Sequence, residues 1–389
     1  MRRFDILCVH PHYDLYGSDR CFIESVASLR AAFPGARIRV LVPKYCKLSI
    51  LIQPFVDEVS VAPLWVIRKR YLRRLITRDL FRLPHALSRA YARFRASDLV
   101  YINTVTAIDY MVVAGLFRRK AILHVHEAPT GIVGWALRLL VRAIRVPTIF
   151  NSTATREFYS LPAAVPSYVL YNGFRGPDAV ELSTYDGLRP LRLLMLGRIN
   201  RGKGQDLLIE ACSRLPRSLL DCLEVRIVGS TFDAQLKLEE DLHHRAKAVS
   251  RSDVIRFEPF VADPSAHFQW CDLAVVPSRV PEGFGRVAVE AMAFGRASIV
   301  AAHGGLTEIV VNQETGWHFA PNDPQALADC ICRALNSPET VTAFGQAGRL
   351  RFENLFAAHL VDQQFKRIVS GLVQQAQEAQ CRSRRGRRS

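Results

Sequence analysis

Short apolar runs alternate with longer helical patterns along almost the whole chain of 389 residues, and this alternation limits the possible folds most strongly. A strand, a helix and a second strand in this order are typical of a parallel βαβ unit. In the first half, the predicted strands are 4–10, 37–43, 57–63, 98–103, 121–127, 147–152 and 167–174. In the second half they are 191–197, 224–230, 254–260, 273–278 and 297–302. The sequence therefore predicts an α/β protein with two parallel sheets.

A polar stretch, "RGPDAVELSTYDGLRP" at 175–190, separates the two series of strands and is the predicted linker. The last helical pattern, about 342–378, is long enough to return across the junction between the domains. The predicted parts are a first domain over 1–180, a second over 190–360, the end of a crossover helix over 361–380, and a disordered basic tail over 381–389.

Residues 193–211, "LLMLGRINRGKGQDLLIEA", contain an incomplete phosphate-binding signature. Gly197, Gly202 and Lys203 have the G-x-x-x-x-G-K spacing of a P-loop, but the next position, which needs a hydroxyl to hold magnesium, is Gly204. The segment follows a predicted strand, and open α/β sheets bind ligands beyond the carboxyl ends of their strands. From these residues alone, a damaged nucleoside triphosphatase, a chance match and another way of holding a phosphate all stay open.

A second candidate segment is "PSRVPEGFGRVAVEAMAFG", residues 277–295. Glu282 lies in a loop after a strand, Gly283-Phe284-Gly285 leads into a helix, and we expect Glu290 about two turns along it. Glycines at the start of a helix let backbone N–H groups approach an anion or a sugar oxygen closely. The two carboxylates could accept hydrogen bonds from hydroxyls on two parts of one ligand. Taken singly, each could instead be a capping or a solvated glutamate.

The formal charge of +16 indicates an anionic partner. Residues 66–82, "VIRKRYLRRLITRDLFR", form a predicted amphipathic helix that could lie on an anionic membrane surface, or pack with a solvated basic flank. No nucleic-acid-binding motif accompanies the charge, so we expect no nucleic-acid partner.

No apolar stretch reaches the ~18 residues of a membrane-spanning helix, and the short run near residue 5 is a predicted strand rather than a signal peptide. The nine cysteines are scattered without metal-binding spacing, which is typical of reduced thiols. These features predict a cytoplasmic protein, with peripheral attachment to the inner face of the cytoplasmic membrane as an option.

At this point the sequence resembles a known family. "EGFGRVAVE" (282–290) matches the E-x7-E motif of retaining glycosyltransferases of family 4, also called glycosyl transferases group 1. The segments around 193–211 and 277–330 are similar to that family, as is the N-G turn in "LYNGF"; "YGSDRCFIESVASL" and "HVHEAP" resemble it more loosely. The resemblance implies the GT-B fold, with two Rossmann-like domains facing each other across a cleft and a C-terminal helix crossing back to the first domain.

The resemblance also implies how the second domain would bind a nucleotide diphosphate sugar. Arg198 and Lys203 would clamp the diphosphate without a metal, which makes the P-loop likeness a coincidence. Glu290 would bind the ribose hydroxyls, and the catalytic Glu282 would hold the donor sugar. Backbone groups of Gly283, Phe284 and Gly285 would line the pocket. No D-x-D occurs in the chain, in agreement with an absence of metal and of any other cofactor.

In the first domain, the resemblance implies that Gly17 and Ser18 approach the diphosphate and that His126 faces the reacting sugar. The usual Gly-Gly of the first loop is here Gly17-Ser18, where the serine can still donate its backbone N–H. For His126, an orienting or proton-shuttling imidazole and a structural histidine at a strand end both stay open. His124 is expected on the same face of the strand.

The implied function is transfer of a hexose-type sugar to an acceptor hydroxyl, in bacterial surface polysaccharide or glycolipid biosynthesis. The implied acceptor is a saccharide or a lipid-linked saccharide. A nucleotide-sugar epimerase of the same fold and a catalytically silent, nucleotide-binding subunit remain alternatives. A dinucleotide dehydrogenase is disfavoured because no G-x-G-x-x-G follows a strand.

Overall fold

The computed structural model describes residues 3–12, 17–66, 80–231, 236–249 and 254–385. The chain forms two compact units. The first unit combines residues 1–173 with 359–389, and the second unit is the continuous segment 174–358. Among the described residues, none of the helices is long and apolar enough to span a membrane.

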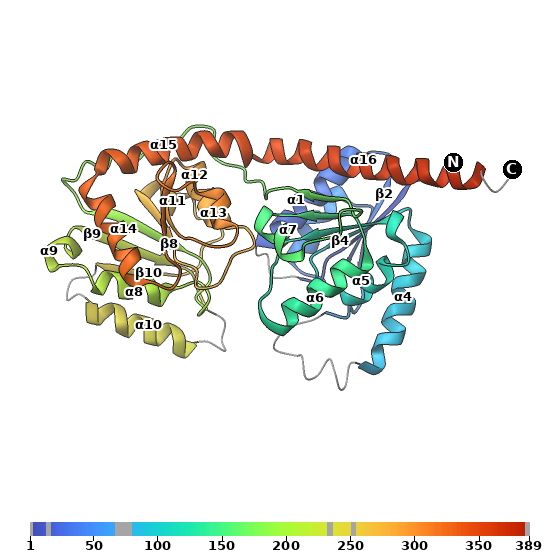
Figure 1. The fold of residues 1–389 in the computed structure, drawn as a ribbon, viewed down its shortest axis with the longest axis horizontal. Coiled ribbons are helices and arrows are strands. Elements are labelled where there is room, and N and C mark those ends of the chain that lie inside the picture. The colour runs from blue at the N-terminus through green and yellow to red at the C-terminus, as the bar shows by residue number, and fades with distance from the viewer. Residues whose placement is uncertain (1–2, 13–16, 67–79, 232–235, 250–253, 386–389) are drawn as a thin grey trace. The chain divides into compact units, whose positions relative to one another are not determined.

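The first unit is built around a parallel sheet (Figure 1). Its strands are β1 (Asp5–Val9), β2 (Arg37–Val42), β3 (Glu58–Val61), β4 (Leu99–Asn103), β5 (Ala121–Val125), β6 (Thr148–Phe150) and β7 (Ser167–Val169). Its α-helices are α1 (Gly17–Ala32), α2 (Lys47–Ile52), α4 (Leu83–Ala96), α5 (Ile108–Ala114), α6 (Gly131–Ile144), α7 (Thr153–Tyr159) and α16 (Ala358–Arg385). Short 3-10 turns are η1 (Gln53–Phe55), η3 (Leu80–Arg82) and η4 (Arg118–Lys120).

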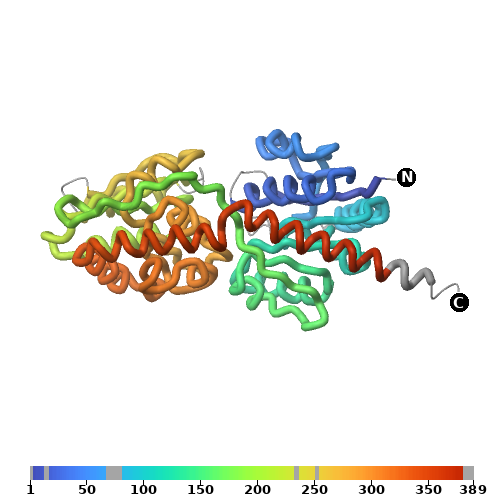
Figure 2. The backbone as a smooth tube through the Cα atoms, turned by 90° about the horizontal axis from the view of Figure 1, so that it is seen from above, coloured from blue at the N-terminus to red at the C-terminus, as the bar shows by residue number. Residues whose placement is uncertain are grey.

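The seven strands of this sheet lie in the order β3-β2-β1-β4-β5-β6-β7 and are all parallel. Alternate side chains of β1 enter opposite layers, because neighbouring residues of a strand face opposite sides of the sheet. Leu7 and Val9 join the core with α4, α5, α6 and α7, whereas Ile6 and Cys8 join the core with α1, α2 and α16. The C-terminal helix therefore completes one layer of the first unit (Figure 2).

The second unit contains a six-stranded parallel sheet in the order β10-β9-β8-β11-β12-β13. Its strands are β8 (Leu191–Leu196), β9 (Leu223–Val228), β10 (Ile255–Glu258), β11 (Leu273–Val276), β12 (Ala297–Ala301) and β13 (Gly316–Phe319). Its helices are α8 (Gln205–Ser213), α9 (Arg217–Leu220), α10 (Leu236–Val249), α11 (Ser265–Trp270), α12 (Arg286–Ala293), α13 (Leu306–Ile309), α14 (Pro324–Asn336) and α15 (Pro338–Leu355). One core lies between the sheet and helices α8, α10 and α14.

Two predicted elements differ from the structure. Strand β13 was not predicted, because its four residues, "GWHF", are too short to show a period. The helical pattern predicted as continuous over 342–378 is two helices, α15 and α16, with a break at Phe356–Ala357. The break arises because Phe174 pairs with this segment: its N–H donates to the Phe356 carbonyl at 2.9 Å, and its carbonyl accepts from Ala358 N–H at 3.0 Å.

The predicted linker and tail also differ. Residues 175–190 belong to the second unit, where Ser183 and Arg189 both bond the carboxylate of Asp272 and Tyr185 is buried. The tail predicted as disordered from 381 continues as helix α16 to Arg385, in keeping with the helix propensity of Gln, Ala, Glu and Arg. Most of the basic helix predicted over 66–82 lies outside the described residues.

Candidate functional site

The predicted site residues of the second unit gather where the strand order of the sheet changes direction. Strands β8 and β11 are neighbours; the connection after β8 leads to β9 on one side, and the connection after β11 leads to β12 on the other. The loops that follow β8 and β11, residues 197–204 and 277–285, therefore diverge from the same edge of the sheet. Such a switch point is the usual ligand site of an open α/β sheet.

The loop after β8 is shaped by Asn200 and Gly204. The side-chain oxygen of Asn200 accepts hydrogen bonds from the N–H groups of Gly202 and Lys203, at 2.9 and 3.1 Å. Gly204 caps helix α8 in a left-handed conformation with φ of 80°. A Cβ at Gly204 would lie only 2.0 Å from the carbonyl oxygen of Pro277, so only glycine fits there. The loops after β8 and β11 are thus packed backbone against backbone.

Lys203 and Glu282 form an ion pair across these two loops. The Lys203 Nζ donates to Glu282 Oε1 at 2.8 Å, and the Ser278 hydroxyl donates to the same oxygen. Burial raises the pKa of Glu282, but the Lys203 ammonium and the Ser278 hydroxyl outweigh it and hold the pKa below its ordinary value. His303 Nε2 hydrogen-bonds the Ser278 carbonyl at 2.7 Å and lies near the carboxylate. Glu282 is therefore an ionised, fixed hydrogen-bond acceptor.

Arg279 also links the same two loops. Its guanidinium bonds the carboxylate of Asp206 on α8, with distances of 2.8 to 3.2 Å, and its backbone N–H donates to the Gly202 carbonyl at 2.9 Å. The bidentate pair holds the start of α8 against the loop after β11. This support was not predicted, because Arg279 and Asp206 are far apart in sequence.

Glu290 is buried on α12, one turn rather than the expected two after the helix begins, since residues 283–285 stay in the turn. The Nε of Arg286 donates to its Oε1 at 2.7 Å. Arg198, the other predicted cation, is half-buried directly after Gly197, and its carbonyl accepts from Gln205 Nε2 at 3.0 Å.

The glycine turn at 283–285 contacts a second glycine turn. Gly285 caps α12 with φ of 110°, and its missing side chain leaves room for Leu306. The Gly305 N–H donates to the Glu282 carbonyl at 2.8 Å. The Phe284 ring is buried against Phe356, with ring centroids 6.1 Å apart. Phe284 can therefore offer a ligand only its backbone.

In the first unit, the switch point falls between β1 and β4, and a chain of buried polar side chains follows the ends of these strands and β5. Asp19 Oδ1 lies 2.6 Å from His10 Nε2, His10 Nδ1 lies 2.9 Å from Asn103 Nδ2, and Asn103 Oδ1 lies 2.9 Å from His126 Nε2. The His10 ring is also stacked on Phe22. His126 is thus held by residues from two other strand ends and one helix: His10 after β1, Asn103 at the end of β4, and Asp19 of α1.

The hydrogen bonds in this chain fix the tautomers. A carboxylate can only accept, so His10 donates from Nε2 and accepts from Asn103 through Nδ1. Asn103 then presents its carbonyl oxygen to His126, which must donate from Nε2. The Nδ1 of His126 is left as an acceptor; it is buried and has no hydrogen-bond partner of good geometry within the part of the chain that the structure describes, with Asn172 of the predicted N-G turn nearby. Burial and the neighbouring histidines hold the pKa of His126 well below its usual range, so the imidazole is neutral.

Other polar groups surround His126. His124 lies on the same side of β5, as expected, with its ring 4.2 Å from that of His126 and its Nδ1 2.5 Å from the Tyr101 hydroxyl. Burial raises the pKa of Glu127 to about 7, with a further contribution from the Asp19 carboxylate. Its buried Oε2 has no hydrogen-bond partner among the described residues. Glu127 lies in the segment "HVHEAP" and was not predicted as a site residue, because its burial is not visible in the sequence.

Gly17 and Ser18 are the first residues of α1, where backbone N–H groups are free of helical bonds. Gly17 is exposed and Ser18 half-buried, so an anion can reach this end of the helix. The residue after Ser18 is Asp19, which ties the same turn to His10.

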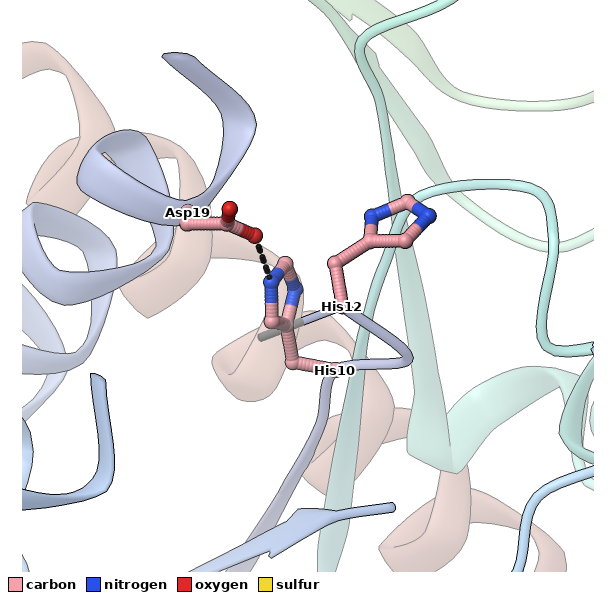
Figure 3. Close-up of side chains that lie close together, drawn as sticks. All are labelled: His10, His12 and Asp19. Carbon is pink, nitrogen blue, oxygen red and sulfur yellow. Dashed lines mark hydrogen bonds and ion pairs between the residues drawn. The ribbon is translucent and has the colours of Figure 1, made fainter. Parts of the chain in front are cut away.

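Figure 3 shows the one group of described side chains that could supply three ligand atoms to a metal ion: His10, His12 and Asp19. Their ligand atoms lie within 4.8 Å of one another. Donors around one zinc ion at 2.0–2.1 Å are about 3.3 Å apart. His10 and Asp19 instead bond each other directly, and Asn103 occupies the other nitrogen of His10. This arrangement fits a hydrogen-bonded pair better than a metal centre. The expected absence of a metal stays a prediction.

Comparison with known proteins bears on both units. Residues 188–351 match the family described as glycosyl transferases group 1. A D-inositol 3-phosphate glycosyltransferase of Geodermatophilus obscurus is 36% identical over 156 residues, which cover 39% of this chain and 34% of that protein. A lipopolysaccharide 1,2-N-acetylglucosaminetransferase of Salmonella typhimurium is 32% identical over 208 residues, covering 49% and 53%. The chain thus spans between a third and about half of the length of these relatives.

Among solved structures, HepE of Anabaena, crystallised with UDP, has a TM-score of 0.77 at 21% identity, over 95% of this chain and all of that one. The lipopolysaccharide glycosyltransferase WaaG has a TM-score of 0.66 at 16% identity, again over 95% of this chain. At such identities the likeness concerns the fold. It confirms the predicted GT-B class, with two parallel-sheet α/β domains and a C-terminal helix that returns to the first.

Proposed function

We propose that this protein is a retaining, metal-independent glycosyltransferase that moves a hexose-type sugar from a nucleotide diphosphate sugar to an acceptor hydroxyl. The observation that carries the proposal is the ion pair of Lys203 and Glu282, 2.8 Å long, at the switch point of the second sheet. The pair lies within residues 188–351, which match the glycosyl transferases group 1 family. Surface ion pairs are common, but this one joins two loops at the edge where such sheets bind ligands.

In the proposed reaction, the bond between the sugar C1 and the diphosphate oxygen breaks, and a bond from the acceptor oxygen to C1 forms. The proton of the acceptor hydroxyl passes to the diphosphate, which leaves with the electron pair of the broken bond. Negative charge therefore grows on the diphosphate. Arg198, Lys203 and the free N–H groups at the start of α8 would stabilise this charge where it develops, without a metal ion.

Glu282, ionised and fixed by Lys203 and Ser278, would accept a hydrogen bond from a hydroxyl of the donor sugar and stabilise positive charge near C1. Glu290 would accept hydrogen bonds from the ribose hydroxyls, in competition with Arg286. The backbone of Gly283, Phe284 and Gly285 would line the sugar and phosphate pocket.

Of the first unit, Gly17 and Ser18 would direct their backbone N–H groups to the diphosphate. His126 is neutral and has an acceptor at Nδ1, so its proposed role is to orient a hydroxyl of the reacting sugar. This supports the orienting alternative over a proton shuttle, because an imidazole with a strongly lowered pKa takes up a proton poorly.

The acceptor in this proposal is a saccharide or a lipid-linked saccharide of bacterial surface polysaccharide or glycolipid biosynthesis. The first unit contains 32 Lys and Arg against 13 Asp and Glu, a formal charge of +19, while the second contains 20 against 23, a formal charge of −3. Such a difference favours an anionic acceptor on the first unit. We propose a cytoplasmic location, with the predicted helix 66–82 at the inner face of the membrane.

Thermal unfolding with UDP, GDP, ADP and dTDP, each in EDTA and then in magnesium, tests donor binding. At 100-fold excess over Kd, binding stabilises by about 2.7 kcal/mol, a shift of several degrees. One nucleotide should stabilise the protein equally in EDTA and in magnesium; UDP comes first because HepE binds it. A shift only with magnesium would refute the metal-free clamp, and no shift with any nucleotide would refute donor binding.

The chemistry is then tested with the sugar nucleotide of the base found and a panel of acceptors. Glu282→Ala should reduce transfer severely without unfolding the protein. Conversion of the donor into its epimer without any acceptor would favour the epimerase instead. Unchanged transfer by the variant would remove Glu282 from the mechanism.

A further inference from the structure

Helix α6 of the first unit is apolar on its exposed face as well as on its buried face. Its buried residues, Gly134, Leu137, Val141 and Ile144, face the sheet. The opposite face carries Ile132, Trp135, Ala136, Leu139 and Ala143, all of which are exposed. Ile132, Trp135 and Leu139 are 80%, 61% and 46% exposed. The spacing of these residues by three and four places them in one stripe along the helix.

This pattern differs from that of an ordinary surface helix, which carries polar residues on the side away from the core. A helix that is apolar all round is normally covered on every side. Within α6, the only charged residues are Arg138 and Arg142, and both lie on one flank of the stripe. The helix lies at the outside of its unit in Figure 1. We therefore expect the apolar surface of a partner or a membrane to cover the stripe in the functional protein.

The apolar surface continues beyond the end of α6 onto the end of α5. A Cβ at Gly115 would lie 3.5 Å from the Cα of Ile144, so the two helix ends are in contact. The residue after Gly115, Leu116, is 73% exposed, and two exposed arginines follow it at positions 118 and 119. Exposed apolar side chains with arginines beside them are typical of a helix that lies in the interface of a membrane.

We propose that the exposed stripe of α6 (Ile132, Trp135, Ala136, Leu139 and Ala143) docks on an anionic membrane surface. Three observations favour a membrane over a protein partner. The stripe is narrow and straight, it contains a tryptophan, which is enriched at the membrane interface, and the charged residues that α6 itself contributes beside it are both arginines. The unit that carries it has a formal charge of +19, which complements anionic headgroups.

The stripe begins close to the buried polar residues of the first unit. Helix α6 begins at Gly131, five residues after His126, so its first exposed residue lies near the carboxyl end of β5. A membrane in contact with the stripe would meet the first unit beside the same edge of the sheet that carries the buried polar chain. The docking surface does not depend on glycosyl transfer, and it is separate from residues 66–82.

Flotation with vesicles of phosphatidylcholine and phosphatidylglycerol, at low salt, tests the proposal with the full chain. Wild-type protein should float with these vesicles and much less with phosphatidylcholine alone. The triple variant Ile132→Ser, Trp135→Ser, Leu139→Ser should lose about tenfold or more of the affinity, because its apolar contacts are gone. The matched control is Leu188→Ser, Leu236→Ser, Phe260→Ser, which changes three side chains of similar exposure in the second unit.

Tryptophan fluorescence gives an independent readout at the stripe. Brominated lipids should quench wild-type fluorescence, and the quenching should fall in Trp135→Phe, which keeps an aromatic ring. Equal circular dichroism of all variants is expected, since the replaced side chains are exposed, and it verifies that they are folded.

Three results would overturn the proposal. The first is wild-type protein that does not float at low salt, and the second is a triple variant that floats as well as the wild type, which would place any membrane contact elsewhere. The third is a concentration-dependent dimer that the triple variant abolishes while flotation is unaffected. In that case the stripe would be an interface between copies of the chain.

Discussion

The ion pair between Lys203 and Glu282 leads to an unusual prediction: neutralising the proposed catalytic carboxylate should strengthen the binding of UDP. In the structure, the Lys203 ammonium is 2.8 Å from Glu282, so part of its charge is already balanced. The Glu282→Gln variant keeps the shape of the side chain but removes that balance. Lys203 then presents its full charge to the diphosphate.

The size of the effect follows from the distance and the exposure. Two unit charges 2.8 Å apart attract by about 1.5 kcal/mol in water and about 6 kcal/mol at an effective dielectric constant of 20. The Lys203 side chain is 33% exposed, and solvent screens such pairs strongly. We therefore expect Glu282→Gln to gain about 1 kcal/mol, a Kd for UDP roughly fivefold lower. Lys203→Met should raise the Kd instead, and the double variant should resemble Lys203→Met.

Isothermal titration calorimetry with UDP measures these differences. The control is Glu210→Gln, which removes a carboxylate from another ion pair of the same unit, also 2.8 Å long but at the surface with Arg214. It changes the total charge equally and should leave the Kd unchanged. If Glu282→Gln bound UDP no better than the wild type, Lys203 would not be the cation that meets the diphosphate. Sugar transfer by Glu282→Gln should nevertheless be lost.

Further predictions concern the first unit and the loop after β8. Burial raises the pKa of Glu127 to about 7, whereas the ordinary value is 4.5. The Glu127 carboxyl therefore keeps its proton to a higher pH in the folded state than in the unfolded chain. The folded state loses stability as the pH rises from the unfolded pKa to the folded pKa of this group. In thermal unfolding, Glu127→Gln should be more stable than the wild type at about pH 8, by up to about 3 kcal/mol, and nearly as stable as the wild type at about pH 4. An equal difference in stability at the two pH values would contradict the raised pKa. Asn103→Asp should place a carboxylate against His126 and raise the pKa of that histidine, so sugar transfer should decline toward acidic pH; a profile parallel to that of the wild type would disprove the proposed link. Gly204→Ala puts a Cβ 2.0 Å from a backbone carbonyl and should cost about 2 kcal/mol or more in unfolding experiments, whereas Gly371→Ala, with open space around it, should be neutral or stabilising.

The sequence indicated most of the strands and the edge of the second sheet where the site residues lie. This was possible because βαβ units are local: each strand is followed by its own loop, so Lys203 and Glu282 could be assigned to the carboxyl ends of their strands. The contact between the two side chains could not be predicted. It depends on β8 and β11 being neighbours in the sheet, and their sequence separation does not determine that.

The buried polar chain of the first unit was missed for the same reason. Asp19, His10 and Asn103 carry no motif, and His10 and Asn103 are 93 residues apart. Only the pairing of β1 with β4 brings them together. The break between α15 and α16 was also unpredictable, because it depends on hydrogen bonds from Phe174, more than 180 residues earlier.

The return of α16 to the first unit determines the order in which the two units can be completed during synthesis. Phe365, Val369 and Leu372 of this helix belong to the same core as Phe22 and Ile38. A ribosome releases the second unit, residues 174–358, as one continuous segment before it has made α16. Domains fold as they emerge, so the second unit can finish first, while the earlier-made unit waits with an uncovered apolar layer. A chain shortened before residue 359 would keep that layer open permanently, which makes it a substrate for chaperones and proteases.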